Sequence, residues 1–229
     1  MIHLMTDTET LGTRPGAIIL SVAFVRFTDE ASMSVNLSVP EQEALGMEMD
    51  PGTLQWWHDQ EAKAPGAYAA ATVNPLSLVP ALEYINQWIA WAAPDDPRYW
   101  CHGATFDCPL LQELYRRVGV PCPWGGRDFW RVRDTRTLYD LACINEKDYA
   151  VPPPHIALND AIGQTRAANA ALAILARAHQ IQPAPPPIDF AAAQPVTYTG
   201  THCAECGTAQ FNTYSGVTCL NGHGGADAA

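Results

Sequence analysis

The sequence predicts an α/β fold in which helices pack on a mixed β-sheet, followed by a small tail rich in Cys and His. Residues 1–40 contain three strand-like stretches in quick succession, and the following residues up to 179 alternate helical and strand patterns. Beyond them the composition changes abruptly to Pro and Ala. We therefore expect a main domain at residues 1–180, an extended linker at 181–199 and a separate tail at 200–229.

The N-terminal residues predict an antiparallel meander. Apolar or alternating residues fit strands at Ile2–Thr6, Ala17–Phe27 and Met33–Val39. The Gly and Pro content of Gly12–Gly16 predicts a turn between the first two strands. Strands this close in sequence pair antiparallel, because parallel neighbours need a long crossover connection.

Helices and strands then alternate. Apolar residues at helical spacing predict a helix at Leu78–Ala92. A strand at Tyr99–His102 precedes a helix around Leu110–Val118, and a strand at Phe129–Val132 precedes a helix that Asp134 would cap. The Ala- and Leu-rich segment Ala157–His179 predicts a long final helix.

Composition excludes several classes of protein. A net charge of −11 argues against a protein that coats nucleic acid, because such proteins bind through phosphate-neutralising Lys and Arg. One stretch could still form a local positive surface: Arg116, Arg117, Arg127, Arg131, Arg133 and Arg136. The apolar runs are too short to span a bilayer, and seven unevenly spaced Cys do not suit a disulfide framework. We expect no membrane association and a cytoplasmic location in a bacterium or a phage-infected cell.

Asp7 and Glu9 stand at the end of the first strand. Residues two apart in a strand point to the same face, so the two carboxylates lie side by side. Like charges this close disfavour ionisation unless a cation lies between them. Taken alone, the pair also fits a solvated sheet edge, which is the more frequent explanation of such a triplet.

Two later motifs carry further candidates. Asp107 follows the strand that ends at Cys101-His102-Gly103 and opens a helix, where an acidic residue also serves as an ordinary N-terminal residue. His155 and Asp160 flank the start of the long helix after a Pro-rich loop, where a lone His is most often a surface residue. Each motif has an ordinary explanation when considered alone. These explanations do not account for the order and the local setting of the three motifs together.

Together these motifs resemble the DEDDh-type, DnaQ-like 3′–5′ exonucleases, which are related to the proofreading subunit of bacterial DNA polymerase. That family has Asp-x-Glu on its first strand, an Asp opening a central helix and a late His-x₄-Asp. The similarity is closest to the phage and bacterial enzymes of the DexA and exonuclease VIII kind, on segments 5–12, 54–57 and 133–138. Cys101-His102-Gly103 departs from that group, which often has Asn-Gly there. The resemblance implies a ribonuclease H-like fold, a mixed five-stranded sheet flanked by helices.

The resemblance also implies a mechanism with two Mg²⁺ or Mn²⁺ ions. Asp7 would bridge both ions, Glu9 and Asp160 would hold the ion that activates water, and Asp107 would help to hold the site together. His155 would act as general base. Thr10 and Leu11 would contact the terminal nucleotide, and Phe106 would pack on its sugar or base. Trp56 and Trp57 are candidates for base stacking, although a buried or interface pair of aromatic residues is the more frequent explanation.

The tail has the pattern C-x₂-C-x₁₂-C-x₃-H, formed by Cys203, Cys206, Cys219 and His223. Two close pairs of sulfur and nitrogen ligands suit one structural tetrahedral zinc ion, with His202 as a substitute for His223. The alternative is an unstructured tail with free cysteines. No Lys or Arg follows Arg177, so we expect the tail to be structural or to dock a protein partner.

Three functions remain open from the sequence. The favoured one is a metal-dependent 3′–5′ exonuclease that releases nucleoside 5′-monophosphates from single-stranded or 3′-ended DNA. An exoribonuclease with the same chemistry is the close alternative, because the carboxylates do not touch the 2′-hydroxyl. A non-catalytic module that binds 3′ ends or docks a protein is the third. Related enzymes are often homodimers, but nothing in the chain fixes the oligomeric state.

Overall fold

The structure is a computed structural model that describes residues 1–181, 197–202, 204, 209–213 and 216–219. Two compact units divide the chain, Met1–Ile181 and Gln182–Ala229. Among the described residues, no helix is both long enough and apolar enough to span a bilayer.

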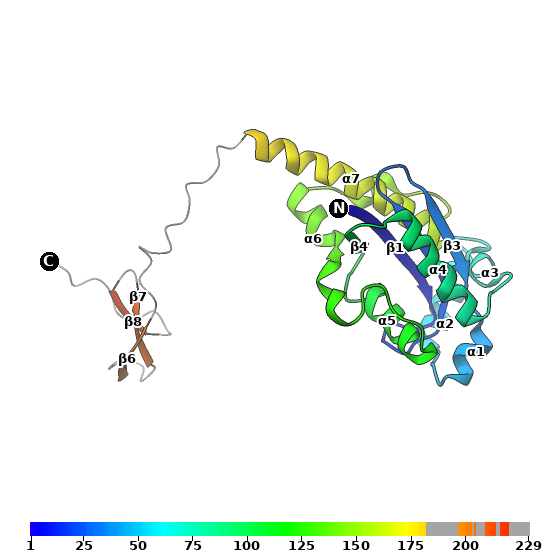
Figure 1. Ribbon diagram of the computed structural model, residues 1–229, viewed down its shortest axis with the longest axis horizontal. Helices are drawn as coiled ribbons and strands as arrows, with labels where there is room; N and C mark the ends of the chain where they lie inside the picture. The colour runs from blue at the N-terminus through cyan, green and yellow to red at the C-terminus, as the bar shows by residue number, and fades with distance from the viewer. Residues whose placement is uncertain (182–196, 203, 205–208, 214–215, 220–229) are drawn as a thin grey trace. The chain divides into compact units, whose positions relative to one another are not determined.

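A five-stranded sheet forms the centre of the first unit (Figure 1). Its strands are β1 (Ile2–Thr10), β2 (Ile19–Arg26), β3 (Ser32–Asn36), β4 (Pro97–Cys101) and β5 (Val132–Asp134). The order is β3-β2-β1-β4-β5, and β2 runs antiparallel to the other four. The expected meander and mixed five-stranded sheet are confirmed, and β1 lies in the middle with a partner on each side.

Helices occupy the remainder of this unit. They are α1 (Val39–Ala44), α2 (Pro51–Gln60), α3 (Ala67–Thr72), α4 (Leu78–Ala92), α5 (Asp107–Val118), α6 (Thr135–Ala142) and α7 (Ala157–Ile181), with 3₁₀ turns at η1 (Gly126–Arg131) and η2 (Glu146–Tyr149). The helices predicted at Leu78–Ala92, around Leu110–Val118 and over Ala157–His179 are confirmed. Asp134 caps α6, accepting a 2.8 Å hydrogen bond from the backbone N–H of Arg136 as expected.

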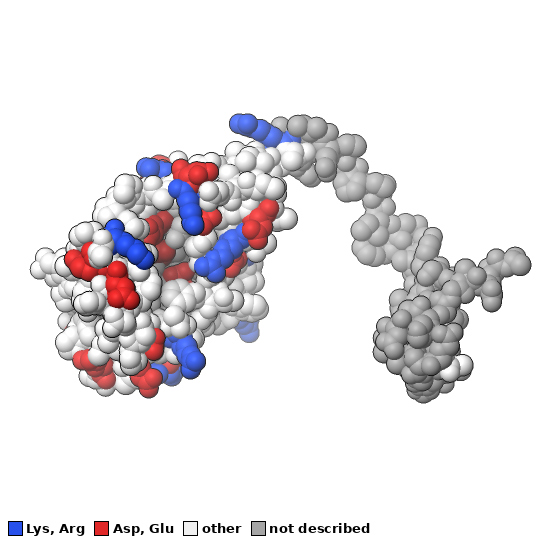
Figure 2. Space-filling model, turned by 180° about the vertical axis from the view of Figure 1, so that it is seen from behind, with Lys and Arg blue, Asp and Glu red and all other residues white. Residues whose placement is uncertain are grey.

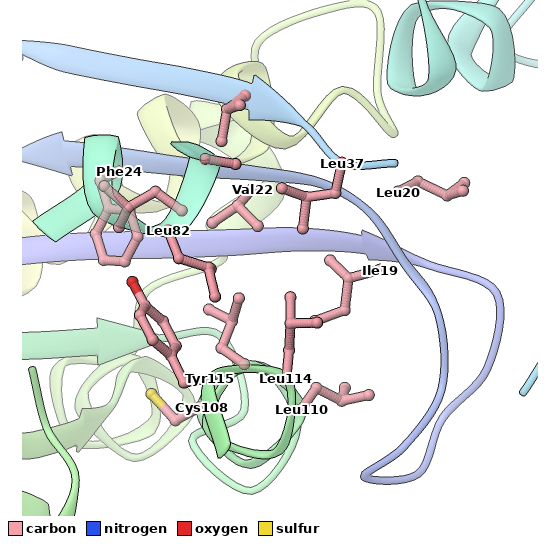
Figure 3. Packing of buried hydrophobic residues seen from close by; sticks show 14 of the residues in the cluster. Ile19, Leu20, Val22, Phe24, Leu37, Leu82, Cys108, Leu110, Leu114 and Tyr115 are labelled. Carbon is pink, nitrogen blue, oxygen red and sulfur yellow. The ribbon is translucent and has the colours of Figure 1, made fainter. Parts of the chain in front are cut away.

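Buried side chains form one layer on each face of the sheet. In β2, Val22 and Phe24 point to the cluster under α4 and α5, whereas Ala23 and Val25 point to the cluster under α6 and α7. Figure 3 shows Leu110, Leu114 and Tyr115 of α5 among the first set. Because every second residue of the central strands enters a different layer, the sheet is covered on both faces.

One expectation about the elements needs correction. Phe129–Val132 is not a strand: residues up to Arg131 form the 3₁₀ turn η1, and the strand is only Val132–Asp134. Phe129 and Trp130 are exposed, so they are not the buried strand residues that their apolar character suggested. Helix α2 begins with Asp50 as its cap, which accepts from the N–H of Thr53 at 3.0 Å, and with Pro51 at its first position.

The second unit contains a three-stranded antiparallel sheet. Its strands are β6 (Thr197–His202), β7 (Ala209–Thr213) and β8 (Gly216–Cys219), in the order β6-β7-β8. Cys219 ends β8, whereas Cys203, Cys206 and His223 lie outside the described residues, as does most of the linker at 181–199. The zinc site therefore stays a prediction.

Candidate active site

Asp7 and Glu9 lie on the central strand, on the face covered by α7. Met5 shares this face and packs in the cluster under α6 and α7. Strand β1 pairs regularly with β2 up to Glu9, and the register shifts between Glu9 and Thr10. Glu9 is buried at 7% exposure although it carries a carboxyl group and has no cationic side chain as an ion-pair partner among the described residues. A buried acidic group without such a partner is uncommon in a purely structural strand.

Asp107 reaches this site from the neighbouring parallel strand. Because β4 runs parallel to β1, the loop after β4 brings the start of α5 beside the end of β1. The Oδ1 atom of Asp107 accepts hydrogen bonds from the backbone N–H of Thr8 at 3.2 Å and from its hydroxyl at 2.7 Å. Asp107 is 2% exposed. Its carboxyl group is thus fixed against β1, so the simple capping explanation does not account for its position.

His155 and Asp160 complete the cluster at the start of α7. The backbone N–H of His155 donates to Oδ2 of Asp160 at 2.9 Å, and His155 adopts a left-handed φ of 60°. One ligand atom each from Glu9, His155 and Asp160 lies within 4.8 Å of the others. The structure therefore brings together all five residues that the sequence singled out for catalysis.

The carboxyl groups of this cluster have shifted pKa values. Burial, with added repulsion from Asp107 and Glu9, raises the pKa of Asp7 well above its usual range. Burial raises the pKa of Glu9 to about 8 and the pKa of Asp107 to about 7. Burial also raises the pKa of Asp160, against the opposing hydrogen bond from His155. The protein places four acidic groups where their own mutual repulsion and desolvation oppose ionisation.

Such a cluster fits divalent cations. Carboxylate oxygens are the donors that Mg²⁺ and Mn²⁺ prefer, and a bound cation would remove the repulsion that raises these pKa values. The residues that could hold the ions are Asp7, Glu9, Asp107 and Asp160.

A cavity of about 560 Å³ opens over the cluster. Its walls come from the end of β1, the start of α2, the loop after β4 and the residues His155 and Arg136. The volume is sufficient for a nucleotide-sized ligand. Acidic groups lie on its buried side, so a ligand that enters meets the cluster at the bottom.

Of the expected nucleotide contacts, two line the cavity and one does not. Thr10 and Phe106 are among its lining residues. Leu11 is 1% exposed and packs in the core, with its backbone N–H donating to the carbonyl of Ile18 at 2.8 Å. The structure thus places Leu11 in the core and not in the cavity.

The two tryptophans of α2 have different surroundings. Trp57 is buried, and its Nε1–H donates to the carbonyl oxygen of Thr10 at 2.9 Å. Trp56 is 40% exposed and meets the ring of His155 edge-on, with 4.8 Å between centroids. Trp57 is therefore the buried aromatic residue that the sequence favoured, whereas Trp56 offers an exposed ring at the cavity wall.

Gln164 is a site residue that the sequence did not identify. It lies one helical turn after Asp160 on α7, and its Nε2 donates to Oδ1 of Asp7 at 2.8 Å. Its backbone carbonyl accepts from the hydroxyl of Tyr139 at 2.8 Å, which holds this turn of the helix against α6. A single Gln in an Ala-rich helix carries no sequence signal of such a role.

The Arg-rich stretch does not form one positive surface. Arg116 and Arg117 both pair with Glu113, and Arg131 pairs with Asp128. On the face seen in Figure 2, blue and red side chains lie next to each other and form no continuous blue area. Ion pairs therefore neutralise three of the six arginines, whereas Arg127, Arg133 and Arg136 form no ion pair among the described residues.

A family model and a phage relative of this chain are both described as exonucleases. Residues 2–172 match the family model described as a 3′–5′ exoribonuclease Rv2179c-like domain. The exodeoxyribonuclease of Enterobacteria phage T4 is 23% identical over 183 residues, which cover 67% of this chain and 78% of the phage protein. Among solved structures, the nuclease domain of 3′hExo, a DEDDh family member bound to rAMP, aligns with a TM-score of 0.47 and 12% identity, covering 78% of this chain and 92% of that one.

Proposed function

We propose how this chain, which belongs to the Rv2179c-like 3′–5′ exoribonuclease domain family, acts on its substrate. It removes nucleoside 5′-monophosphates one at a time from the 3′ end of single-stranded nucleic acid. The family makes residues 2–172 a 3′–5′ exonuclease domain. The released product, the metal ions and the roles of individual residues are our proposal.

The observation that carries the proposal is the buried cluster at the bottom of the cavity. Four carboxyl groups from β1, α5 and α7 meet there; burial raises the pKa of each, and repulsion from neighbouring carboxylates adds to it for Asp7 and Glu9. A protein that only binds 3′ ends has no use for mutually repelling acids, because phosphates bind to cationic groups. The cluster therefore favours hydrolysis over the docking alternative.

We assign four metal ligands, namely Asp7, Glu9, Asp107 and Asp160. When bound, two divalent cations neutralise charge on the phosphate and promote ionisation of the attacking water. The chain fixes three of these oxygen donors: Thr8 holds Asp107, Gln164 holds Asp7, and the backbone of His155 holds Asp160. This arrangement places the donors before substrate arrives, which lowers the reorganisation that binding requires.

His155 is the general base in this proposal. Its ring lies near the carboxyl groups of Glu9 and Asp160 and against the edge of Trp56. An imidazole nitrogen in this position accepts the proton of the attacking water, and Trp56 restricts how the ring can turn. Because His155 lies in the loop before α7, the base and Asp160 move with the same segment.

We propose RNA as the preferred substrate and DNA as the second candidate. The description of the matching family, which covers residues 2–172, favours RNA, whereas the phage relative is an exodeoxyribonuclease and favours DNA. The sequence by itself favoured DNA. The carboxyl cluster acts on the phosphate in both cases, so the choice depends on contacts to the 2′-hydroxyl.

A direct assay tests the proposal. RNA and DNA oligonucleotides of equal sequence, labelled at the 5′ end, are incubated with Mg²⁺ or Mn²⁺ and either the natural chain or Asp7→Asn. We expect a ladder that shortens from the 3′ end, a faster rate on RNA, and no ladder with the variant. Turnover by Asp7→Asn would contradict the metal assignment, and a faster rate on DNA would reverse the substrate order.

We also propose that Cys203, Cys206, Cys219 and His223 hold one zinc ion in the second unit. The support is their spacing in the sequence, which provides two close pairs of sulfur and nitrogen ligands. A segment this short buries little apolar surface, so a bound metal would supply the stability that a core cannot.

A further inference from the structure

Arg136 is the one Lys or Arg among the described residues that lines the catalytic cavity. Its side chain is exposed, and the cavity it lines also contains Asp7, Glu9 and Asp107. The protein carries only 13 Lys and Arg against 24 Asp and Glu, so cationic side chains are the minority among its charged residues. A single guanidinium at the mouth of an acidic cavity needs an explanation.

The backbone around Arg136 is held in place by Asp134. Its Oδ1 accepts the backbone N–H of Arg136 at 2.8 Å, and its Oδ2 accepts the backbone N–H of Ala104 at 2.8 Å. Asp134 therefore joins the first turn of α6 to the loop that leads to Asp107. The guanidinium lies against Gly103, where a Cβ atom would come within 3.3 Å of Nη1 of Arg136.

The guanidinium forms no ion pair among the residues that the structure describes, although its charge opposes the rise in the pKa of Asp107. Six other arginines form ion pairs with carboxylates: Arg26, Arg98, Arg116, Arg117, Arg131 and Arg166. Arg136 forms none of these pairs, although acidic residues line the same cavity. The backbone of Arg136 is held in place and its guanidinium forms no ion pair. Such a side chain is suited to bind an anion that arrives with the substrate.

The depth of the cavity indicates which anion this is. Asp107 and Glu9 lie at the bottom, 2% and 7% exposed, and the scissile phosphate must reach them. Arg136 is exposed and lies at the rim. The 3′-terminal nucleotide of a strand carries only the scissile phosphate, so any other phosphate at the rim belongs to a nucleotide further toward the 5′ end.

We propose that Arg136 binds the phosphate one linkage 5′ of the scissile phosphodiester and so positions the strand for removal of its last nucleotide. This inference rests on the proposed exonuclease function and adds a specific substrate contact to it. Arg136 would then favour a strand with at least two phosphodiester linkages over a substrate that has only the scissile phosphodiester.

The experiment pairs a change in the protein with a change in the substrate. Two oligonucleotides differ only in the linkage one position 5′ of the scissile bond, which is a phosphodiester in one and a neutral methylphosphonate in the other. Both carry 2′-deoxyribose at that linkage for chemical stability. The value of kcat/KM for the first cleavage is measured with the natural chain, Arg136→Ala and Arg136→Lys.

We expect the neutral linkage and Arg136→Ala each to lower kcat/KM by about tenfold, the usual effect of losing one hydrogen bond between charged groups. Combined, they should cause no further loss, because each removes the same contact. The loss should lie in KM, and Arg136→Lys should recover part of it as a point charge. Arg127→Ala is the matched control, since Arg127 is exposed, forms no ion pair among the described residues and does not line the cavity.

Three outcomes would overturn the inference while leaving the exonuclease intact. These are a neutral linkage without effect on the natural chain, losses that multiply in the combined case, and an equal loss when the methylphosphonate is moved three linkages further toward the 5′ end. Failure of the natural chain to cleave either oligonucleotide would instead contradict the proposed function itself. A melting temperature for each variant shows whether it is folded.

Discussion

Gln164 donates a 2.8 Å hydrogen bond to Asp7 across 157 residues of chain, from the final helix of the domain to its first strand. The bond leaves the second carboxyl oxygen of Asp7 without a contact from Gln164. It also opposes the rise in the pKa of Asp7 that burial causes. Gln164 thus orients one of the four carboxylates that would hold the metal ions.

Replacing Gln164 should weaken metal binding without unfolding the protein. We expect Gln164→Ala to lower the affinity for Mn²⁺ by roughly 10- to 100-fold, the usual effect of removing a group that orients a metal ligand. Titration of Mn²⁺ followed by calorimetry measures this. Gln112→Ala is the control, because Gln112 is exposed on α5 and remote from the cluster. Equal affinity in both variants would show that the bond does not position Asp7.

His155→Asn should separate proton transfer from metal binding. Asn adopts a left-handed φ more readily than most residues, so it suits the backbone at φ 60°. We expect kcat to fall by roughly 10²- to 10⁴-fold, as for loss of a general base, with Mn²⁺ affinity nearly unchanged. The part of the pH–rate profile that reports the base should also disappear.

The matched control for this histidine is His58→Ala, whose side chain is 84% exposed on α2. A large drop in Mn²⁺ affinity in His155→Asn would contradict the expectation that this substitution leaves metal binding nearly unchanged. It would indicate that His155 is itself a ligand beside Glu9 and Asp160, which their proximity within 4.8 Å permits.

The stability of the metal-free protein should fall as pH rises. The folded-state pKa of Glu9 is about 8, above the roughly 4.3 of an unfolded chain, so the folded state binds more protons between these values. Its contribution to stability is present below about pH 4 and is lost as pH rises through about 8. Thermal unfolding after chelation should therefore give a lower melting temperature at pH 8 than at pH 6, and Mn²⁺ should restore it.

Tryptophan fluorescence suits this measurement, because all seven Trp residues lie in Met1–Ile181 and none in the tail. The fluorescence signal therefore does not report the removal of any zinc from the tail. Glu9→Gln should show a smaller decrease between pH 6 and pH 8, since it removes one of the titrating groups. The same decrease in both proteins would exclude Glu9 as its source.

Zinc should accompany the purified chain at one ion per molecule. Elemental analysis after purification without added metal measures this, and Cys206→Ser should reduce the content to near zero because thiolate ligands bind zinc strongly. Cys143→Ser is the control, since Cys143 is an exposed free cysteine of the first unit. A zinc-free natural chain would remove the proposed site.

The residues of the carboxyl cluster could be predicted because three motifs follow one another in the order of a known family, although each motif alone has an ordinary explanation. Asp7 and Glu9 end an apolar strand, Asp107 opens a helix after a strand, and His155 with Asp160 begins the long helix. Parallel pairing of β1 with β4 then brings the first three together. The order of the motifs identified these residues, and the strand order explains why they lie together.

Other features depend on long-range packing that no local pattern encodes. Leu11 follows the register shift after Glu9 and packs in the core, which does not fit the nucleotide contact that the family resemblance implied for it. Arg136 belongs to a basic stretch, but its neighbours Arg116 and Arg131 are neutralised by ion pairs that only the structure shows. The apolar residues Phe129 and Trp130 led us to expect a strand. In the structure both are exposed and lie in the 3₁₀ turn η1.

The distance in sequence between Asp7 and Gln164 also determines when activity can begin. During synthesis the central strand of the first unit emerges well before α7, the last helix of that unit, which carries Asp160 and Gln164. Contacts of such long separation form late in folding, because loop closure has to precede them. A nascent chain on the ribosome therefore cannot bring Asp7, Asp160 and Gln164 together until almost all of the first unit has left the exit tunnel.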